Sequence, residues 1–186
     1  MNPDEYSNQS GPLLNADTLE MVSLAQAYCQ LIEQPDAQSA PEWARQALQL
    51  LPKLYLKGLA LSQAVVYDET IDEIEHVVTE DDYNAVRDGV AAVLGTYDDY
   101  LDTFVEDMKY SDKPILKTIS EDLADVYQDI RNFVAAWDGG YDEVMQAALQ
   151  EIASGFGSYW GGRLLSAMRA LHEVAYNLPD EEGEAQ

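Results

Sequence analysis

The chain has 186 residues, 47% of them apolar, which suits one domain with a sizeable hydrophobic core. Its 35 Asp and Glu residues against 10 Lys and Arg residues give a formal net charge of −25 at pH 7. This excess of negative charge repels phosphate groups, which argues against direct nucleic-acid binding and against docking on a membrane.

The distribution of apolar residues divides the chain into one domain between two polar ends. Residues 1–14 contain two prolines and a glycine and predict a flexible tail, and residues 179–186 predict an acidic disordered tail. Residues 15–178 repeat apolar side chains at helical spacing, without a β-pattern or a repeat of fixed period. We therefore predict an all-α domain, a single bundle of about five to seven mostly antiparallel helices.

The first predicted helix begins at a capping box of Asp17 and Glu20 and ends at Gln34, because Pro35 follows. It contains Cys29, the only cysteine, so the chain has neither an intrachain disulfide nor a thiolate zinc site. Because apolar residues surround Cys29 in the sequence, we expect a buried, unreactive thiol.

The second predicted helix begins at a capping box of Ser39 and Glu42. Pro52 lies inside it and should kink or split it, since proline lacks the backbone donor. Residues 65–78 fit either a weak helix or an irregular connector.

A capping box of Thr79 and Asp82 starts the third predicted helix, whose apolar stripe continues to Met108. After a turn at 109–114, a fourth helix runs antiparallel to the third and ends at the Gly139–Gly140 pair.

The fifth predicted helix spans residues 141–177 and is interrupted by four glycines. These indicate either a break into two helices or a face that another backbone approaches closely. The glycines are Gly155, Gly157, Gly161 and Gly162.

Several segments carry distinctive strings: 50–57 (LLPKLYLK), 97–108 (YDDYLDTFVEDM), 109–114 (KYSDKP), 119–133 (ISEDLADVYQDIRNF), 159–163 (YWGGR) and 168–177 (MRALHEVAYN). Together they resemble the bacterial family catalogued as domain of unknown function 5063, over about residues 18–177. The resemblance implies an all-helical cytosolic protein. Since no activity is established for that family, it transfers no catalytic residue.

Asp98, Asp99 and Asp102 spell DDxxD, the motif by which isoprenoid synthases hold Mg²⁺ on a helix. On the third predicted helix these carboxylates would lie roughly 100–160° from the centre of the apolar stripe. They would then face solvent rather than a central cavity, and no second metal motif accompanies them. We interpret them, together with Glu106, as a solvated set.

A broader arrangement pairs Asp99 and Asp102 with Asp122 and Asp125 on the neighbouring helix. Helical Mg²⁺-dependent nucleotide pyrophosphatases use similar carboxylate pairs, so these four are weak candidate metal ligands. The alternative is that they are charged helix flanks, of which Asp122, Asp125 and Asp129 border the apolar stripe of the fourth helix. Residues 73–76 spell ExxH, the spacing at which di-iron helical bundles place two metal ligands. Such a site needs a second ExxH motif, which the sequence lacks, so we interpret these residues as surface residues.

Cations are scarce, so the basic residues after residue 158, together with two adjacent aromatic residues, form a candidate pocket. Its members are Tyr159, Trp160, Arg163, Arg169 and His172. The aromatic side chains could form a pocket wall beside the glycines. The favoured alternative is structural, with the arginines paired to carboxylates of neighbouring helices (Asp122, Asp125 or Asp129).

The chain has no nucleophile elbow and no phosphate-binding loop after a strand, so no catalytic residues and no cofactor are predicted. Residues 1–15 lack the features of a signal peptide, and the longest apolar run, 90–94, is far short of a membrane span of ~20 residues. We expect a cytoplasmic, non-enzymatic protein–protein interaction module whose partner is another protein, in particular a basic one. The alternatives are a Mg²⁺-dependent hydrolase of a nucleotide-like substrate and an acidic nucleic-acid mimic. The oligomeric state stays open.

Overall fold

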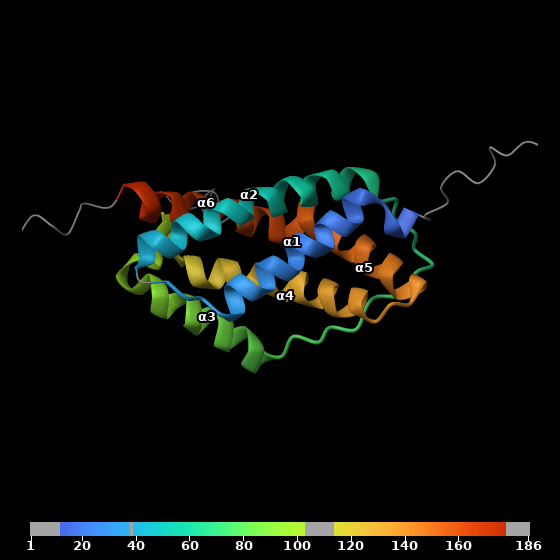
Figure 1. The fold of residues 1–186 in the computed structure, drawn as a ribbon, viewed down its shortest axis with the longest axis horizontal. Helices are drawn as coiled ribbons and strands as arrows, with labels where there is room; N and C mark the ends of the chain where they lie inside the picture. Colours follow the sequence, from blue (N-terminus) through green and yellow to red (C-terminus); the bar gives the residue numbers. More distant parts are fainter. Residues whose placement is uncertain (1–11, 38, 103–113, 178–186) are drawn as a thin grey trace, which may run out of the picture.

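The computed structural model describes residues 12–37, 39–102 and 114–177. These ranges are mostly helical, which confirms the predicted helical bundle (Figure 1). The α-helices are α1 (Ala16–Glu33), α2 (Ala40–Ala64), α3 (Glu80–Leu94), α4 (Ile119–Asp138), α5 (Asp142–Gly155) and α6 (Gly161–Tyr176). Short 3₁₀ turns are η1 (Pro12–Leu14) and η2 (Gly95–Tyr97), and a π-turn, η4 (Phe156–Trp160), joins α5 to α6.

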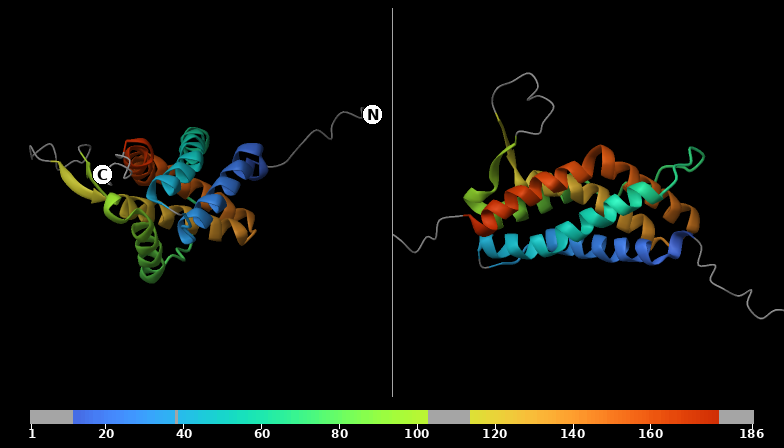
Figure 2. Two further views of the ribbon diagram at one scale, coloured as in Figure 1. Left: turned by 60° about the vertical axis from the view of Figure 1, so that its left-hand side comes forward. Right: turned by 90° about the horizontal axis from the view of Figure 1, so that it is seen from above.

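Helix α4 lies at the centre of the bundle and packs against α1, α3, α5 and α6, while α2 packs mainly on α6 and α1. Two short strands, β1 (Asp99–Asp102) and β2 (Ile115–Thr118), pair antiparallel between α3 and α4. Figure 2 shows this hairpin projecting from the bundle beside α6. In the ranges described, no helix is long and apolar enough to cross a membrane.

The start of α1 differs from the prediction. Asn15 is its N-cap, and the Asn15 side chain accepts a hydrogen bond from the Thr18 amide at 2.9 Å. Asp17 and Glu20 instead bind Lys57 of α2, with Nζ–O distances of 2.8 and 2.7 Å. The two carboxylates therefore form ion pairs between α1 and α2 instead of capping α1, and the capping pattern in the sequence does not predict this.

The starts of α2 and α3 confirm the predictions. The Ser39 hydroxyl accepts from the Glu42 amide at 3.4 Å, and Thr79 with Asp82 forms a complete capping box. Of the kink or split predicted at Pro52, the split does not occur, because α2 continues through it. The buried apolar face of α2 extends on both sides of the proline and outweighs one missing backbone hydrogen bond.

Residues 65–78 form an irregular connector rather than a helix. Two buried amide side chains hold its backbone. The Gln150 side chain accepts from the Asp68 amide at 2.9 Å and donates to the Asp68 carbonyl at 3.1 Å. The Asn132 side chain accepts from the Val77 and Val78 amides at 2.8 and 3.1 Å. These contacts satisfy backbone groups that a helix would have paired internally.

The third predicted helix was too long, and the small two-stranded hairpin that follows it was not predicted. Helix α3 ends at Leu94 because Gly95 follows with φ 58°, and β1 begins four residues later. The predicted end at Met108 and the turn at 109–114 fall largely outside the described residues. Helices α3 and α4 run antiparallel as predicted (Figure 1). The end of α4 also agrees, since Gly139 is its C-cap and Gly140, the next residue, adopts φ 72°.

The glycine-rich region does not break the helix but widens it into the π-turn between α5 and α6. A Cβ atom at Gly58 of α2 would overlap the Trp160 ring and lie 2.6 Å from Phe156 Cδ2. A Cβ atom at Gly161 would lie 2.5 Å from the Phe156 carbonyl oxygen. Close approach of another backbone, the other predicted alternative, is not observed either, since Gly157 and Gly162 have nothing within 4 Å and Gly155 and Gly161 are closest to Trp160 and Phe156 of the same turn. Cys29 is buried as expected, and burial raises the pKa of its thiol to about 12.

Candidate binding cleft

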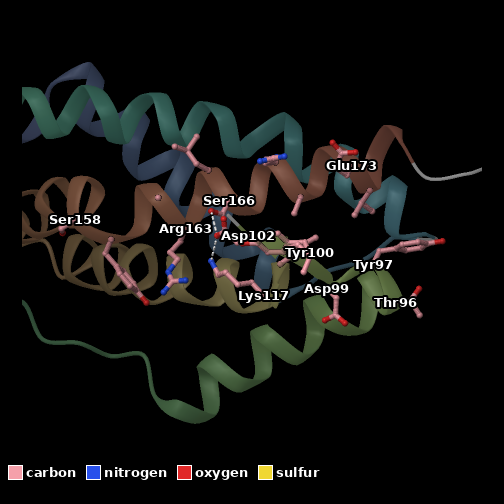
Figure 3. Close-up of a pocket in the computed structure, with 18 residues that line it drawn as sticks. Thr96, Tyr97, Asp99, Tyr100, Asp102, Lys117, Ser158, Arg163, Ser166 and Glu173 are labelled. Carbon is pink, nitrogen blue, oxygen red and sulfur yellow. Dashed lines mark hydrogen bonds and ion pairs between the residues drawn. The ribbon is translucent and has the colours of Figure 1, made fainter. Parts of the chain in front are cut away.

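A cleft of about 1000 Å³ lies between the β-hairpin and α6 (Figure 3). All four residues of β1 line it, whereas β2 contributes only Lys117. The opposite wall comes from η4 and α6, where lining residues recur every three or four positions from Gly162 to Glu173. We call it the hairpin cleft. Its lining is residues 96–97, 99–102, 117, 119, 158–159, 162–163, 165–166, 169–170 and 173–174.

Large apolar side chains surround the opening of the hairpin cleft. Leu101 of β1 is 64% exposed, Leu165 of α6 is 47% exposed and Tyr159 of η4 is 44% exposed. Single exposed apolar residues are ordinary, but three around one concave surface are typical of a binding site.

The polar floor of the hairpin cleft is built on Asp122, a fully buried residue of α4. Its carboxylate accepts from Lys117 Nζ at 2.6 Å, from Arg163 Nη1 at 3.2 Å and from the Tyr100 hydroxyl. Arg163 also binds Asp125 one turn further along α4, with an Nε–Oδ2 distance of 3.3 Å. A buried carboxylate is tolerated only when it is paired in this way.

The side chain of Asp102 connects β1 to strand β2 and to helix α6. Its Oδ2 atom lies 3.4 Å from Lys117 Nζ on β2 and accepts from the Ser166 hydroxyl of α6 at 3.4 Å. Figure 3 shows Lys117, Asp102 and Ser166 directed toward one another. Together with the contacts of Asp122, they attach the hairpin to the bundle.

The ionisation of these groups follows from their burial. Burial, and then the nearby Asp122 carboxylate, raises the pKa of Tyr100 well above its usual value, so the phenol stays a hydrogen-bond donor. Tyr83, whose hydroxyl donates to Asp125 at 3.1 Å, has its pKa raised by burial and then by Asp125. Burial disfavours the charged guanidinium of Arg163, but Asp125 and Asp122 outweigh it and raise its pKa. These shifts keep Arg163 charged and leave Tyr100 and Tyr83 as neutral hydrogen-bond donors.

The solvated carboxylate set was predicted only in part. Asp99 is exposed, but Asp98 and Asp102 are buried, and Glu106 lies outside the described residues. Asp98 accepts from the Ser120 amide at 2.8 Å and from its hydroxyl at 2.6 Å. The error followed from the helix assumed there, which would have turned these side chains outward.

The structural prediction for the arginines is confirmed for Arg163, which binds Asp122 and Asp125. Asp129 behaves differently: it is partly buried, and burial followed by the charge of Glu151 raises its pKa to about 6. Arg169 is exposed in the cleft and forms no ion pair with the residues that the structure describes.

The candidate pocket residues separate into two groups. Tyr159, Arg163 and Arg169 line the hairpin cleft. Trp160 is fully buried and donates from Nε1 to the Ile152 carbonyl at 2.9 Å, and His172 lies beside Tyr176 with ring centroids 4.9 Å apart. Sequence reasoning missed Tyr100 and Lys117, because only the hairpin brings them to this place.

The weak metal candidates are not arranged as one centre. Asp99 is apart on the exposed side of β1, while Asp102, Asp122 and Asp125 bind Lys117 and Arg163. Across the described ranges, no group of three or more His, Cys, Asp or Glu side chains is placed to hold a metal ion. The ExxH residues Glu73 and His76 lie in the irregular connector, with His76 Nε2 at 2.5 Å from Glu151 Oε1.

Comparisons with known proteins support one assignment. The family model described as Domain of unknown function (DUF5063) matches residues 13–177. The crystal structure of protein BF1032 from Bacteroides fragilis, a structural genomics target, is similar with a TM-score of 0.75 and 32% identity, over 88% of this chain and 98% of that chain. A search of curated proteins gave no match. The chain therefore belongs to this family of unknown function.

Proposed function

We propose that the chain is a non-enzymatic interaction module that binds a segment of another protein in the hairpin cleft. The observation that carries this proposal is a large cleft with an apolar rim over a polar floor whose charged groups are already paired with one another. Such a surface offers apolar contact area and a few polar groups, which is how recognition sites are built.

The pairing of the polar groups favours binding over catalysis. A general base or a nucleophile needs a group that is free to react, but Asp122 binds Lys117, Arg163 and Tyr100. A hydrolase that used Asp102 and Asp122 as metal ligands would first have to displace Lys117 from both. The network instead serves to hold the cleft in shape.

The charge of the molecule supports a protein partner. The net charge of −25 attracts a partner whose surface is basic on balance and speeds its approach. The hairpin cleft nevertheless contains three of the chain's ten cationic residues, namely Lys117, Arg163 and Arg169. Long-range attraction and local recognition therefore use different parts of the surface.

A selection of random linear peptides on the full chain tests this proposal. Gly162 lines the cleft and a Cβ atom there would meet nothing within 4 Å, so Gly162→Trp fills the cleft without a clash at the backbone. Gly157 has equally open surroundings but does not line the cleft, which makes Gly157→Trp a matched control.

We expect selected peptides to bind the unmodified chain and Gly157→Trp with equal affinity in fluorescence anisotropy. Gly162→Trp should weaken binding roughly tenfold or more, that is by about 1.4 kcal/mol. Circular dichroism should show the same helix content for all three proteins. The proposal is wrong if no specific peptide emerges, or if Gly162→Trp binds as tightly as Gly157→Trp.

A further inference from the structure

The two walls of the hairpin cleft have the geometry of a strand edge facing a helix. β1 pairs with β2 on one side, and in the described ranges no strand occupies its other side. All four β1 residues line the cleft, but only one β2 residue does, so the cleft runs along β1. In a two-stranded ladder every second residue directs its N–H and C=O groups away from the partner strand.

The opposite wall has a matching length. The lining residues Gly162, Leu165, Arg169 and Glu173 form one stripe along α6, which spans roughly 16 Å at 1.5 Å per residue. β1 spans about 13 Å at 3.3 Å per residue. A segment of four or five extended residues fits between two walls of these lengths.

Charge selects the kind of segment. Lys117 and Arg163 are already bound by buried carboxylates. Arg169 is exposed in the cleft without an ion pair in the described part of the chain, and its neighbour Glu173 accepts from Asn177 Nδ2 at 2.6 Å. The guanidinium of Arg169 is thus available to a carboxylate that enters from outside.

We infer that an extended segment of a partner protein adds to the free edge of β1 as a third strand and places an acidic side chain on Arg169. Leu101, Leu165 and Tyr159 would cover the apolar side chains of the segment. Strand addition uses main-chain hydrogen bonds for affinity and side-chain pockets for specificity. This inference rests on the proposed function, since it names the partner segment of the same cleft.

Backbone methylation of a selected peptide tests the strand addition. Each N-methyl group removes one amide donor, so affinity should fall roughly three- to tenfold at every second position and stay unchanged between them. In hydrogen exchange by NMR, the β1 amides that point away from β2 should become protected when the peptide binds. A peptide that is sensitive to Gly162→Trp but lacks both signatures overturns the strand addition and leaves the binding function intact.

Arg169→Gln tests the acidic contact, with Lys53→Gln on the exposed side of α2 as the control. We expect Arg169→Gln to weaken binding roughly two- to fivefold at low salt and Lys53→Gln to leave it unchanged. Replacing the acidic residue of the peptide with glutamine should cause no further loss in Arg169→Gln. Additive losses from the two changes would show that the carboxylate binds elsewhere.

Discussion

Two buried regions of this protein are built on opposite principles. The tryptophan cluster, made of Tyr55, Gly58, Phe156 and Trp160, is apolar and packs two rings edge to face with centroids 4.9 Å apart. The aspartate network under the hairpin cleft is ionic. Its members are Tyr100, Asp102, Lys117, Asp122, Asp125 and Arg163.

The difference shows how stability and binding are divided. Burial of apolar rings is favourable for almost any close-packed shape and holds α2 against the π-turn. A buried carboxylate costs desolvation, which is offset only when donors approach in one geometry. The tryptophan cluster therefore stabilises the bundle, whereas the aspartate network fixes the position of the hairpin and hence the shape of the cleft.

The largest effect is expected from Trp160→Ala. Trp160 is fully buried and its indole N–H binds the Ile152 carbonyl, so truncation should lower the free energy of unfolding by about 3–5 kcal/mol. Urea denaturation measures this loss. Tyr159→Ala, its exposed neighbour, should cost less than about 1 kcal/mol. Equal losses at the two positions would contradict the assignment of stability to the cluster.

Asp122→Asn should cost about 3 kcal/mol, because it leaves Lys117 and Arg163 without their shared counter-charge. Because the network holds the hairpin rather than the bundle, hydrogen exchange of the backbone amides in Asp122→Asn should increase in β1 and β2 before it increases in the helices. Asp99→Asn, at an exposed position of β1, is the control and should change neither the stability nor the exchange of the hairpin amides. Exchange that rises uniformly over the bundle would show that the network does not act on the hairpin specifically.

Asp129→Asn should stabilise the protein at neutral pH. The native-state pKa of Asp129 is about 6, above its ordinary value, so the protonated carboxyl group contributes stability that is fully present below about pH 4 and is lost as the group ionises when pH rises through 6. The neutral amide avoids this loss and the repulsion from Glu151 and Asp125, although it also forgoes the attraction of His76. We expect a gain of about 1–2 kcal/mol at pH 7.5 and none at pH 4 in thermal denaturation. A gain that is independent of pH would refute the titration of Asp129.

The smallest effect is expected from Tyr100→Phe, which removes one of several donors to Asp122 and should cost about 1 kcal/mol. The loss should disappear in an Asp122→Asn background, because the two residues belong to one network. Tyr83→Phe, which removes a single bond to Asp125 at the edge of the same network, is the matched comparison. Additive losses for Tyr100 and Asp122 would mean that their contact contributes nothing.

Local features of the fold could be read from the sequence. Apolar spacing placed the helices, Ser39 and Thr79 marked the starts of α2 and α3, and Gly139–Gly140 marked the end of α4. The pairing of Arg163 with Asp122 and Asp125 also followed, because cations are scarce and these carboxylates border an apolar stripe. Such signals depend on residues within a turn or two of each other, or on the simple rule that buried charges need partners.

Tertiary structure alone decided the hairpin and the cleft. The stretch after Gly95 continues a helical period, yet Asp98 bonds to Ser120, twenty-two positions later, and the strand pairs with residues beyond the intervening segment 103–113. The burial of Asp102 and the ion pair between Lys117 and Asp122 follow from that strand pairing. Because a carboxylate can be exposed or buried according to which distant donors reach it, composition and periodicity fixed the bundle, whereas long-range contacts made the binding cleft.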